Sequence, residues 1–430
     1  MESTLTYVPK WSTPALVAFR FIFVYFLIYV LPFPVDLIPY GEVITGPLHA
    51  LFFSVTEYFG KFILDGSYVS PPSTTGSGDT TFHYVQMLFA TLLTGVITIV
   101  WSVVDRKRCN YEELLYWFVI FLRYYLAFTM LIYGFAKVLR TQFPPLTTAS
   151  LNKTYGDSSP MNLLWTFMGY SGPYTIFAGL GEVVGGVFLF FRRTRLLGAL
   201  TVAIVISHVL MLNLSFDVPV KLFSSHLLLI AVIIMTPDLK RLLNFFILNE
   251  IAYPQRTRPL YNTRQKKWIY FVCKSLVLIS LVSQTFISNW KQKQTINEYF
   301  VSMERDNWIN GQYEIETFVV NNDTLPAVQN DTRRWKEVTI SGKEIRIQNM
   351  DGASINWHFL GNVGYKRMVI YSPDLSTYGN FTFRSDSSGM TIVGTLHTDT
   401  LNIVTHKKSS SGYLLTDRGF HWVNEYPFNR

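Results

Sequence analysis

The residue of this 430-residue chain that most clearly could do chemistry is Glu182. It lies in the middle of an apolar run, residues 173–191, that is long enough to cross a bilayer. A carboxylate at that depth is costly and needs a partner or a water-filled cavity. Four glycines around it would let a neighbouring helix come close: Gly179, Gly181, Gly185 and Gly186. The sequence therefore predicts a polar site inside a membrane protein.

Two histidines flank a turn between two further apolar runs. His208 and His226 lie nine residues before and after Asp217. An antiparallel helical hairpin centred on Asp217 would place both imidazoles at a similar depth, with Lys221 at the start of its second arm. Imidazoles can relay protons near neutral pH. Two histidines could also hold a haem, although adjacent helices do not by themselves give axial geometry.

Two basic residues in the run 113–139 complete the set. We expect Arg123 to lie near the level of Glu182, and Lys137 to lie near the outer end of the run. An outward-facing pocket of such residues could move protons or bind an anionic or quinone-like head group. The candidate catalytic residues are Glu182, Lys137, His208 and His226, and the candidate substrate-binding residues are Arg123, Asp217 and Lys221. In the alternative interpretation, ion pairs only lock the helices together and each histidine donates to a backbone carbonyl.

A glycine-containing stretch, GSGDTT at residues 76–81, precedes the second apolar run. Its amide groups around Gly78 and Asp79 could form a nest that binds an anion at a helix start, so both are also candidate substrate-binding residues. The favoured alternative is that Asp79 or Thr80 caps the following helix.

The composition is that of a membrane protein. Hydrophobic residues make up 49% of the chain and charged residues only 15%, with a mean hydropathy of +0.22. About a quarter of a soluble chain is charged. Seven apolar runs have the length of a membrane span: 15–35, 82–104, 113–139, 173–191, 196–213, 219–236 and 268–288. A further amphipathic stretch, residues 47–64, predicts a helix lying on the membrane interface.

The basic residues predict the orientation. Fourteen Lys and Arg fall in segments 1–14, 105–112, 192–195 and 237–267, and four fall in segments 36–81, 140–172 and 214–221. The positive-inside rule then places the N-terminus in the cytoplasm and the C-terminal part outside. The net charge of +8 is explained by this topology, so no nucleic-acid partner is expected. The two cysteines, Cys109 and Cys273, form no metal-ligand pattern or redox pair, and no metal site is expected.

The period of the apolar residues changes to two from about residue 313. Nine short candidate strands follow, at 313–320, 334–340, 343–348, 354–359, 365–371, 380–384, 390–396, 401–406 and 419–423. Turn sequences separate most of them. This spacing predicts a small antiparallel barrel or sandwich.

Residues 123–247 resemble the DoxX family of small four-helix bacterial membrane proteins. The resemblance rests on RYYLAFTMLIYGFAKVLR with Gly134 and Lys137, on GLGEVVGGVFLFFRRTRLLGAL with Glu182, and on the run ending in TPDLKRL. It implies a membrane subunit tied to quinone or thiol redox chemistry. The extra spans, the large polar domain and the missing cysteine pair depart from that family. The plan of a helical membrane domain joined to an outer β domain is also similar to that of the vitamin K-dependent carboxylases, although no motif carries that assignment.

We therefore expect four regions: 1–111 with two spans and an outer loop, 112–247 as a DoxX-like four-helix core, 248–290 with a basic loop and the last span, and 291–430 as an extracytoplasmic β domain. The expected function is the membrane subunit of a quinone-linked redox system in the bacterial inner membrane. Under this interpretation we expect a bound quinone or quinol, a redox or periplasmic protein partner, and no covalent cofactor. The alternative is a non-enzymatic scaffold or carrier whose β domain binds a partner or a small apolar ligand.

Overall fold

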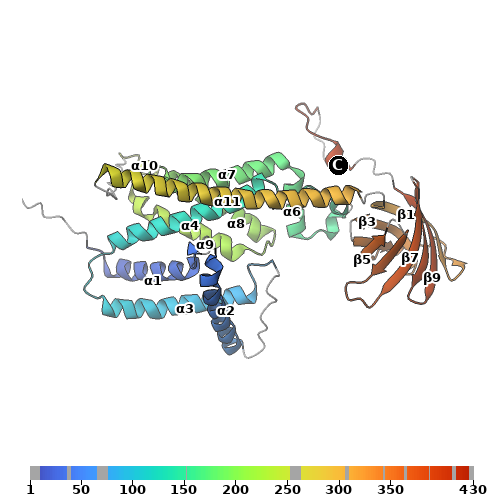
Figure 1. Ribbon diagram of the computed structural model, residues 1–430, viewed down its shortest axis with the longest axis horizontal. Helices are drawn as coiled ribbons and strands as arrows, with labels where there is room; N and C mark the ends of the chain where they lie inside the picture. Colours follow the sequence, from blue (N-terminus) through green and yellow to red (C-terminus); the bar gives the residue numbers. More distant parts are fainter. Residues whose placement is uncertain are drawn as a thin grey trace, which may run out of the picture. The chain divides into compact units, whose positions relative to one another are not determined.

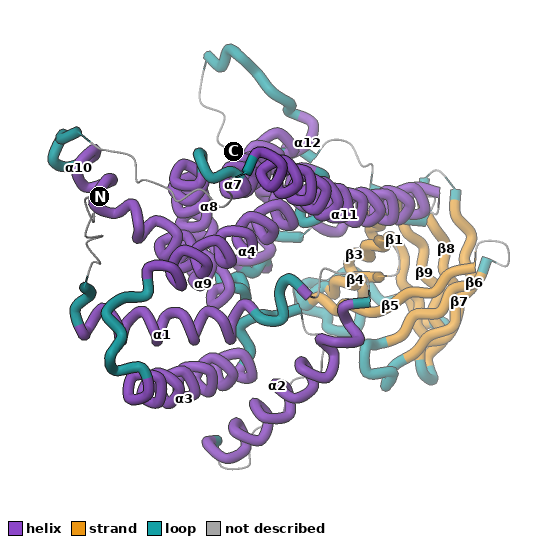
Figure 2. The backbone as a smooth tube through the Cα atoms, turned by 60° about the vertical axis from the view of Figure 1, so that its left-hand side comes forward, coloured by secondary structure: helices purple, strands orange, loops and turns teal. Residues whose placement is uncertain are grey.

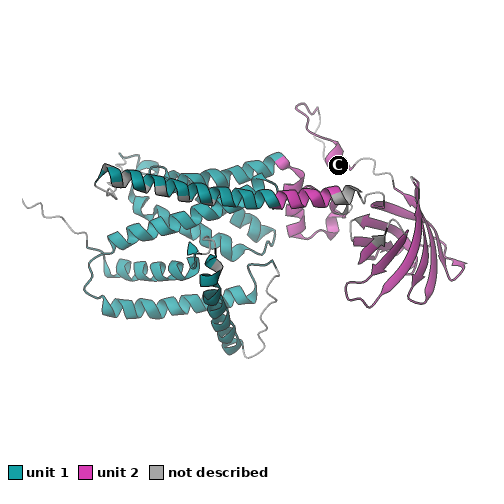
Figure 3. Ribbon diagram, viewed as in Figure 1, with its two compact units in different colours: residues 1–143, 173–291 teal, residues 144–172, 292–430 magenta. Residues whose placement is uncertain are grey.

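The structure, a computed structural model, describes residues 10–35, 40–64, 76–151, 153–251, 263–305, 309–341, 344–362, 366–386, 388–408 and 413–425. The chain divides into two compact units (Figure 3). Unit 1 comprises residues 1–143 and 173–291, and unit 2 comprises residues 144–172 and 292–430. Residues 144–172, which lie within the predicted four-helix core 112–247, thus belong with the C-terminal unit.

Unit 1 is helical. Its helices are α1 (Thr13–Val30), α2 (Gly41–Ile63), α3 (Thr81–Val104), α4 (Glu112–Val138), α7 (Gly172–Phe190), α8 (Arg195–Ser215), α9 (Lys221–Met235), α10 (Leu239–Phe246) and the first part of α11 (Arg264–Arg305). Six helical stretches of the described residues are long and apolar enough to cross a membrane: α1, α3, α4, α7, α8 and Lys221–Phe246. This confirms the predicted polytopic membrane part. Residues 268–288 are helical within α11 but are not among the six, so their crossing of the membrane stays a prediction.

Helix α2 runs across the direction of α1 and α3, as Figure 1 shows. It packs on α3 through two ring contacts, Phe53 with Phe82 and Phe59 with Phe89. Several of its bulky apolar side chains remain exposed, among them Tyr58 and Phe62. The helix predicted at 47–64 is therefore present and begins six residues earlier.

Local sequence explains where several helices begin and end. Thr80 caps α3, in a capping box completed by His83. Helix α4 has Glu112 and Glu113 in its first turn and Lys137 in its last, which suits the helix dipole. Helix α1 ends directly before the Leu31–Pro32 bond, because a proline cannot continue the helical hydrogen bonds.

The segments rich in Lys and Arg meet at one end of unit 1, here called the basic end. The backbone N–H of Trp11 donates to the carbonyl of Cys109. The Arg192 guanidinium lies 5.8 Å from the centre of the Tyr116 ring, and Arg195 pairs with Asp238 at 2.5 Å. The start of α1, the α3–α4 and α7–α8 connections, and the end of α9 therefore share the basic end.

Unit 2 contains a closed β-barrel. Its strands are β1 (Gly311–Val320), β3 (Trp335–Ser341), β4 (Glu344–Asn349), β5 (Ser354–Asn362), β6 (Arg367–Tyr371), β7 (Tyr378–Ser385), β8 (Gly389–Leu396) and β9 (Asp399–Lys407), with the two-residue β2 (Asp323–Thr324) beside β1. Each of the eight long strands pairs antiparallel with the next long strand, and β9 pairs back with β1 (Figure 2). The closure confirms the barrel form of the prediction, and among the described residues each of the eight long strands is paired on both sides.

The interior of the barrel is filled by apolar side chains. On β7, buried residues alternate with exposed ones, and Phe381 and Phe383 point inward. They join one buried cluster with residues from every long strand, including Ile315, Ile340 and Ile403. The eight long strands correspond to the first eight predicted strands.

The ninth predicted strand, residues 419–423, is wrong. These residues follow the short helix α12 (Leu414–Asp417) and form no strand. Phe420 and Trp422 contact each other, but Trp422 is 90% exposed. The eight strands already close the barrel, so no edge remains for a ninth to join.

The rest of unit 2 is the segment 144–172, with α5 (Thr148–Leu151), η2 (Tyr155–Asp157) and α6 (Pro160–Tyr170). Ser159 caps α6, because its Oγ accepts the N–H of Asn162 at 3.2 Å. Asp157 forms an ion pair with Arg346 of β4 at 3.5 Å. The segment therefore lies against the outer surface of the barrel.

Candidate functional site

The site is built where α4 and α7 cross closely. A Cβ atom placed on Gly179 would lie 2.8 Å from the carbonyl oxygen of Gly134 and 2.7 Å from the Cβ of Lys137. A Cβ atom placed on Gly134 would lie 2.6 Å from Val183. Only glycine fits at both positions, so the two backbones touch, as small residues permit between membrane helices.

This crossing brings together Lys137 of α4 and Glu182 of α7. The Lys137 Nζ donates to both carboxylate oxygens of Glu182, each at 2.9 Å. The side chains are 8% and 2% exposed, respectively. Two of the candidate site residues thus form a buried ion pair in which one ammonium binds both carboxylate oxygens.

Arg123 does not lie at the level of Glu182, contrary to the prediction. It precedes Lys137 by fourteen residues on α4, or roughly 21 Å along the helix axis. Its guanidinium lies 5.1 Å from the centre of the Tyr124 ring, and the side chain is buried. The residue of α4 that lies against Glu182 is Lys137, in the last turn of the helix.

His226 of α9 is buried between tyrosines of α1. Its Nδ1 lies 2.7 Å from the Leu222 carbonyl and its Nε2 lies 2.7 Å from the Tyr25 hydroxyl. A carbonyl can only accept, so Nδ1 carries the proton, and in the neutral ring Nε2 accepts from Tyr25. The Tyr29 ring stacks on the imidazole with centroids 4.2 Å apart. The histidine therefore has a defined tautomer and a phenol as its proton partner.

Tyr133 lies beside the ion pair and contacts α9, the helix of His226. It precedes Lys137 by one helical turn, and the Lys137 Nζ lies 5.9 Å from the centre of its ring. The Tyr133 ring also packs against Phe223 of α9, three residues before His226, with ring centroids 5.7 Å apart. We call Tyr25, Tyr29, Tyr133, Lys137, Glu182 and His226 the polar core. It joins side chains from α1, α4, α7 and α9.

His208 is not part of the polar core. It lies seven residues before the end of α8, and His226 lies five residues after the start of α9, so their depths are similar as predicted. The His208 side chain, however, is exposed, on the same face as the exposed Ile204 and Met211. The prediction of one shared pocket is thus wrong for this histidine, and the pair does not suit a haem held between them.

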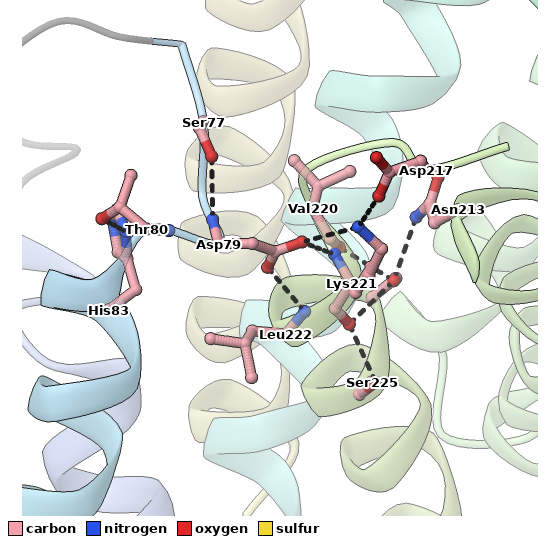
Figure 4. Close-up of polar contacts among 11 residues, drawn as sticks. Ser77, Asp79, Thr80, His83, Asn213, Asp217, Val220, Lys221, Leu222 and Ser225 are labelled. Atoms are coloured by element: carbon pink, nitrogen blue, oxygen red, sulfur yellow. Dashed lines mark hydrogen bonds and ion pairs between the residues drawn. The ribbon is translucent and has the colours of Figure 1, made fainter. Parts of the chain in front are cut away.

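Asp79 caps α9 from outside that helix, as Figure 4 shows. Its two carboxylate oxygens accept the backbone N–H groups of Lys221 at 2.7 Å and Leu222 at 3.0 Å. The Gly78 N–H donates to the Pro219 carbonyl at 2.8 Å. An anion does occupy a helix start here, but it is the protein's own carboxylate. The nest predicted for a bound anion at Gly78 and Asp79 is therefore a structural cap.

Lys221 and Asp217 belong to the same capping group. The Lys221 Nζ lies 2.7 Å from Asp217 and 4.0 Å from Asp79. Next to them, the Asn213 amide donates to Ser224, which donates in turn to the Val220 and Lys221 carbonyls. This network joins α3, α8 and α9 at the end opposite the basic end. The two predicted substrate-binding residues thus lie beside the polar core without joining it.

Sequence reasoning missed the three tyrosines of the polar core. Tyr25 and Tyr29 are four residues apart, as are Tyr133 and Lys137, so each pair lies on one helix face. That spacing was the available signal. The described residues contain no group of three or more His, Cys, Asp or Glu placed to hold a metal ion. The polar core instead offers an ammonium, a carboxylate, phenols and an imidazole, which are donors and acceptors of protons.

One comparison with known proteins identifies a relative. Over 127 residues, 29% of this chain, the sequence is 33% identical to the "Uncharacterized protein YwoB" of Bacillus subtilis (strain 168). The match covers 79% of that protein. No protein-family model and no solved structure match the chain.

Proposed function

The chain belongs to the family of the Bacillus subtilis protein YwoB, and from this premise we propose a DoxX-like protein of the bacterial cytoplasmic membrane that binds a quinone head group at its polar core. The observation that carries the proposal is the buried Lys137–Glu182 pair in the same group as the Tyr25–His226 hydrogen bond. Ionisable residues inside a membrane bundle usually serve substrate or proton pathways.

The chemistry of a quinone suits these groups. Reduction of a quinone to a quinol takes up two electrons and two protons at its two carbonyl oxygens. The Lys137 ammonium can donate a hydrogen bond to one oxygen, with Glu182 holding the charge in place. Tyr25 and His226 form a two-member proton relay. The Leu222 carbonyl holds a proton on Nδ1 of His226, so the proton exchanged with Tyr25 is the one at Nε2. In this proposal the electrons come from a redox partner protein, which makes the chain the membrane subunit of a quinone-dependent oxidoreductase.

The proposed orientation places the N-terminus in the cytoplasm and the barrel in the periplasm or outside. It rests on the fourteen basic residues predicted inside against four outside. The meeting of all four of those segments at the basic end supports it. Lys137 lies in the last turn of α4, at the opposite end. The polar core would then be reached from the outer half of the membrane.

The carrier alternative has less support. A barrel that holds an apolar ligand needs an open interior, whereas this interior holds a buried cluster of aromatic and branched side chains. The scaffold form of the alternative, in which the barrel surface contacts a partner, is unaffected by that packing.

Quinone binding tests the proposal directly. The full-length protein in lipid nanodiscs is titrated with a short-chain ubiquinone and a short-chain menaquinone, and binding is followed by tryptophan fluorescence. Tyr25→Phe removes one hydroxyl and is expected to weaken binding about tenfold, the effect of one hydrogen bond. Tyr58→Phe on α2, where the ring is 77% exposed, is the matched control.

Glu182→Gln is expected to weaken binding further, provided that circular dichroism shows the helices intact. Failure of the unchanged protein to bind either quinone, or equal affinity of Tyr25→Phe, Glu182→Gln and the unchanged protein, would refute the proposal. A purely structural role of the polar core predicts that second result.

A further inference from the structure

Unit 2 has a small polar cleft on the outer wall of its barrel. The cleft has a volume of about 150 Å³ and is lined by Thr154, Gln312, Glu337, Thr339, Arg346 and Gln348. Five of these residues come from β1, β3 and β4, and Thr154 comes from the segment 144–172 that lies against the barrel. The cleft is separate from the polar core, which belongs to unit 1.

Strand register explains why these side chains gather. Thr339 pairs with Gln312 on one side and with Arg346 on the other, which gives a row across three strands. Glu337 pairs with Gln348 in the next row on the same face. Outward-facing polar residues of a barrel are normally solvated, but here Thr339 is buried and the others from the strands are half-buried. The rows therefore form the floor of a cleft rather than an open surface.

The charged groups of the cleft are already balanced. Glu337 pairs with Lys408 at 3.0 Å and accepts from the Gln312 amide. Arg346 pairs with Asp157 at 3.5 Å and donates to Ser354 at 3.2 Å. Each charged residue of the lining thus has a partner of opposite sign. An ionic ligand would have to compete with these pairs, whereas a neutral polar ligand would not.

We propose that this cleft binds a neutral, hydroxyl-rich small molecule of the size of one hexose ring. The lining offers two amides and the Thr339 hydroxyl on the floor, each of which can both donate and accept, and the Thr154 hydroxyl on the rim, which donates to Asp157 and can still accept. Such groups match sugar hydroxyls, which also do both. The volume is about ten times what one water molecule requires and below the range of about 300–1,000 Å³ of sites for larger ligands. The proposal does not depend on the proposed function.

Saturation-transfer NMR on the full-length protein tests it. The protein is held in lipid nanodiscs, because sugar-headed detergents would compete, and is presented with glucose, galactose and N-acetylglucosamine. We expect transfer to at least one sugar. Thr339→Val and Gln348→Leu should each weaken that binding about tenfold, through loss of hydrogen bonds from the floor. Thr395→Val, an exposed threonine on β8, is the matched control.

The possible outcomes separate clearly. Loss of transfer in Thr339→Val and Gln348→Leu, with transfer kept in Thr395→Val and an unchanged barrel melting temperature, supports the proposal. Absence of transfer to all three sugars in the unchanged protein overturns it. Binding that neither floor substitution changes overturns the cleft as its location. Displacement of the sugar by millimolar inorganic phosphate overturns the neutral class, because it shows that the charged groups recognise an anion.

Discussion

The Lys137–Glu182 pair predicts a specific pattern of stability changes when its charges are removed singly and together. Both side chains are nearly fully buried, and Nζ lies 2.9 Å from each carboxylate oxygen. Lys137→Met or Glu182→Gln alone leaves one charge buried without its partner, at a cost of about 3–5 kcal/mol. The double variant leaves no charge, so its cost should be well below the sum of the two. We expect the shortfall from additivity to exceed about 3 kcal/mol.

The assay is reversible unfolding in mixed micelles with increasing SDS, followed by far-UV circular dichroism. The Glu57–Lys61 pair on α2 provides the matched control, because its side chains are 31% and 54% exposed. Glu57→Gln, Lys61→Met and their double variant should each change the free energy of unfolding by less than about 1 kcal/mol. Additive effects at Lys137 and Glu182 would refute the reasoning, since they would mean that the two charges do not depend on each other.

The double variant also separates structure from function. If Lys137→Met with Glu182→Gln restores most of the stability but leaves quinone binding abolished, the pair is kept for chemistry. If stability and quinone binding are both restored, the pair serves as a helix lock.

Three further predictions concern other parts of the chain. Gly179→Ala should lower the free energy of unfolding by about 1–3 kcal/mol in the same assay, because its Cβ would lie 2.8 Å from the Gly134 carbonyl oxygen. The control is Gly95→Ala, where nothing lies within 4 Å, and it should be neutral or stabilising by up to about 1 kcal/mol. Equal losses of stability at both sites would contradict the close crossing of α4 and α7. Asp79→Ala should cost about 1–2 kcal/mol by leaving the Lys221 and Leu222 amides without their cap, and Asp79→Asn, which keeps one acceptor oxygen, should cost less. Burial raises the pKa of Tyr313 in the barrel to about 12, so the folded state holds this proton more tightly than the unfolded chain, whose tyrosine pKa is about 10, and barrel stability should fall as pH rises from about 10 to about 12. Urea unfolding of the barrel at a series of pH values should show that decline, and Tyr313→Phe should reduce it.

The sequence predicted the chemical character of the site better than it predicted which residues form it. Glu182 and Lys137 stood out because charge is rare in apolar runs, and this is a local property. Arg123 and His208 stood out for the same reason, yet one lies well along α4 from the pair and the other faces outward. Tyr25 was not selected, because a tyrosine in an apolar run is common. Which of these residues meet depends on how each helix is rotated about its axis.

The strands show the same difference between what local sequence predicts and what tertiary pairing decides. Alternation of apolar and polar residues predicted eight of them, because each strand's pattern is contained in its own residues. Residues 419–423 alternate in the same way but form no strand. Whether a segment pairs depends on an available edge, and the pairing of β1 with β9 removes it.

The sequence by itself determined that this protein has apolar helices of membrane length followed by short strands, with charges inside the apolar part, because hydropathy and its period are properties of neighbouring residues. Only the tertiary structure decided which charges meet. The contact between Gly134 and Gly179 sets the distance between α4 and α7 and so pairs Lys137 with Glu182. The packing of α9 against α1 buries His226 between two tyrosines. These outcomes follow from the faces that separate helices present to each other, and no local stretch of sequence contains that information.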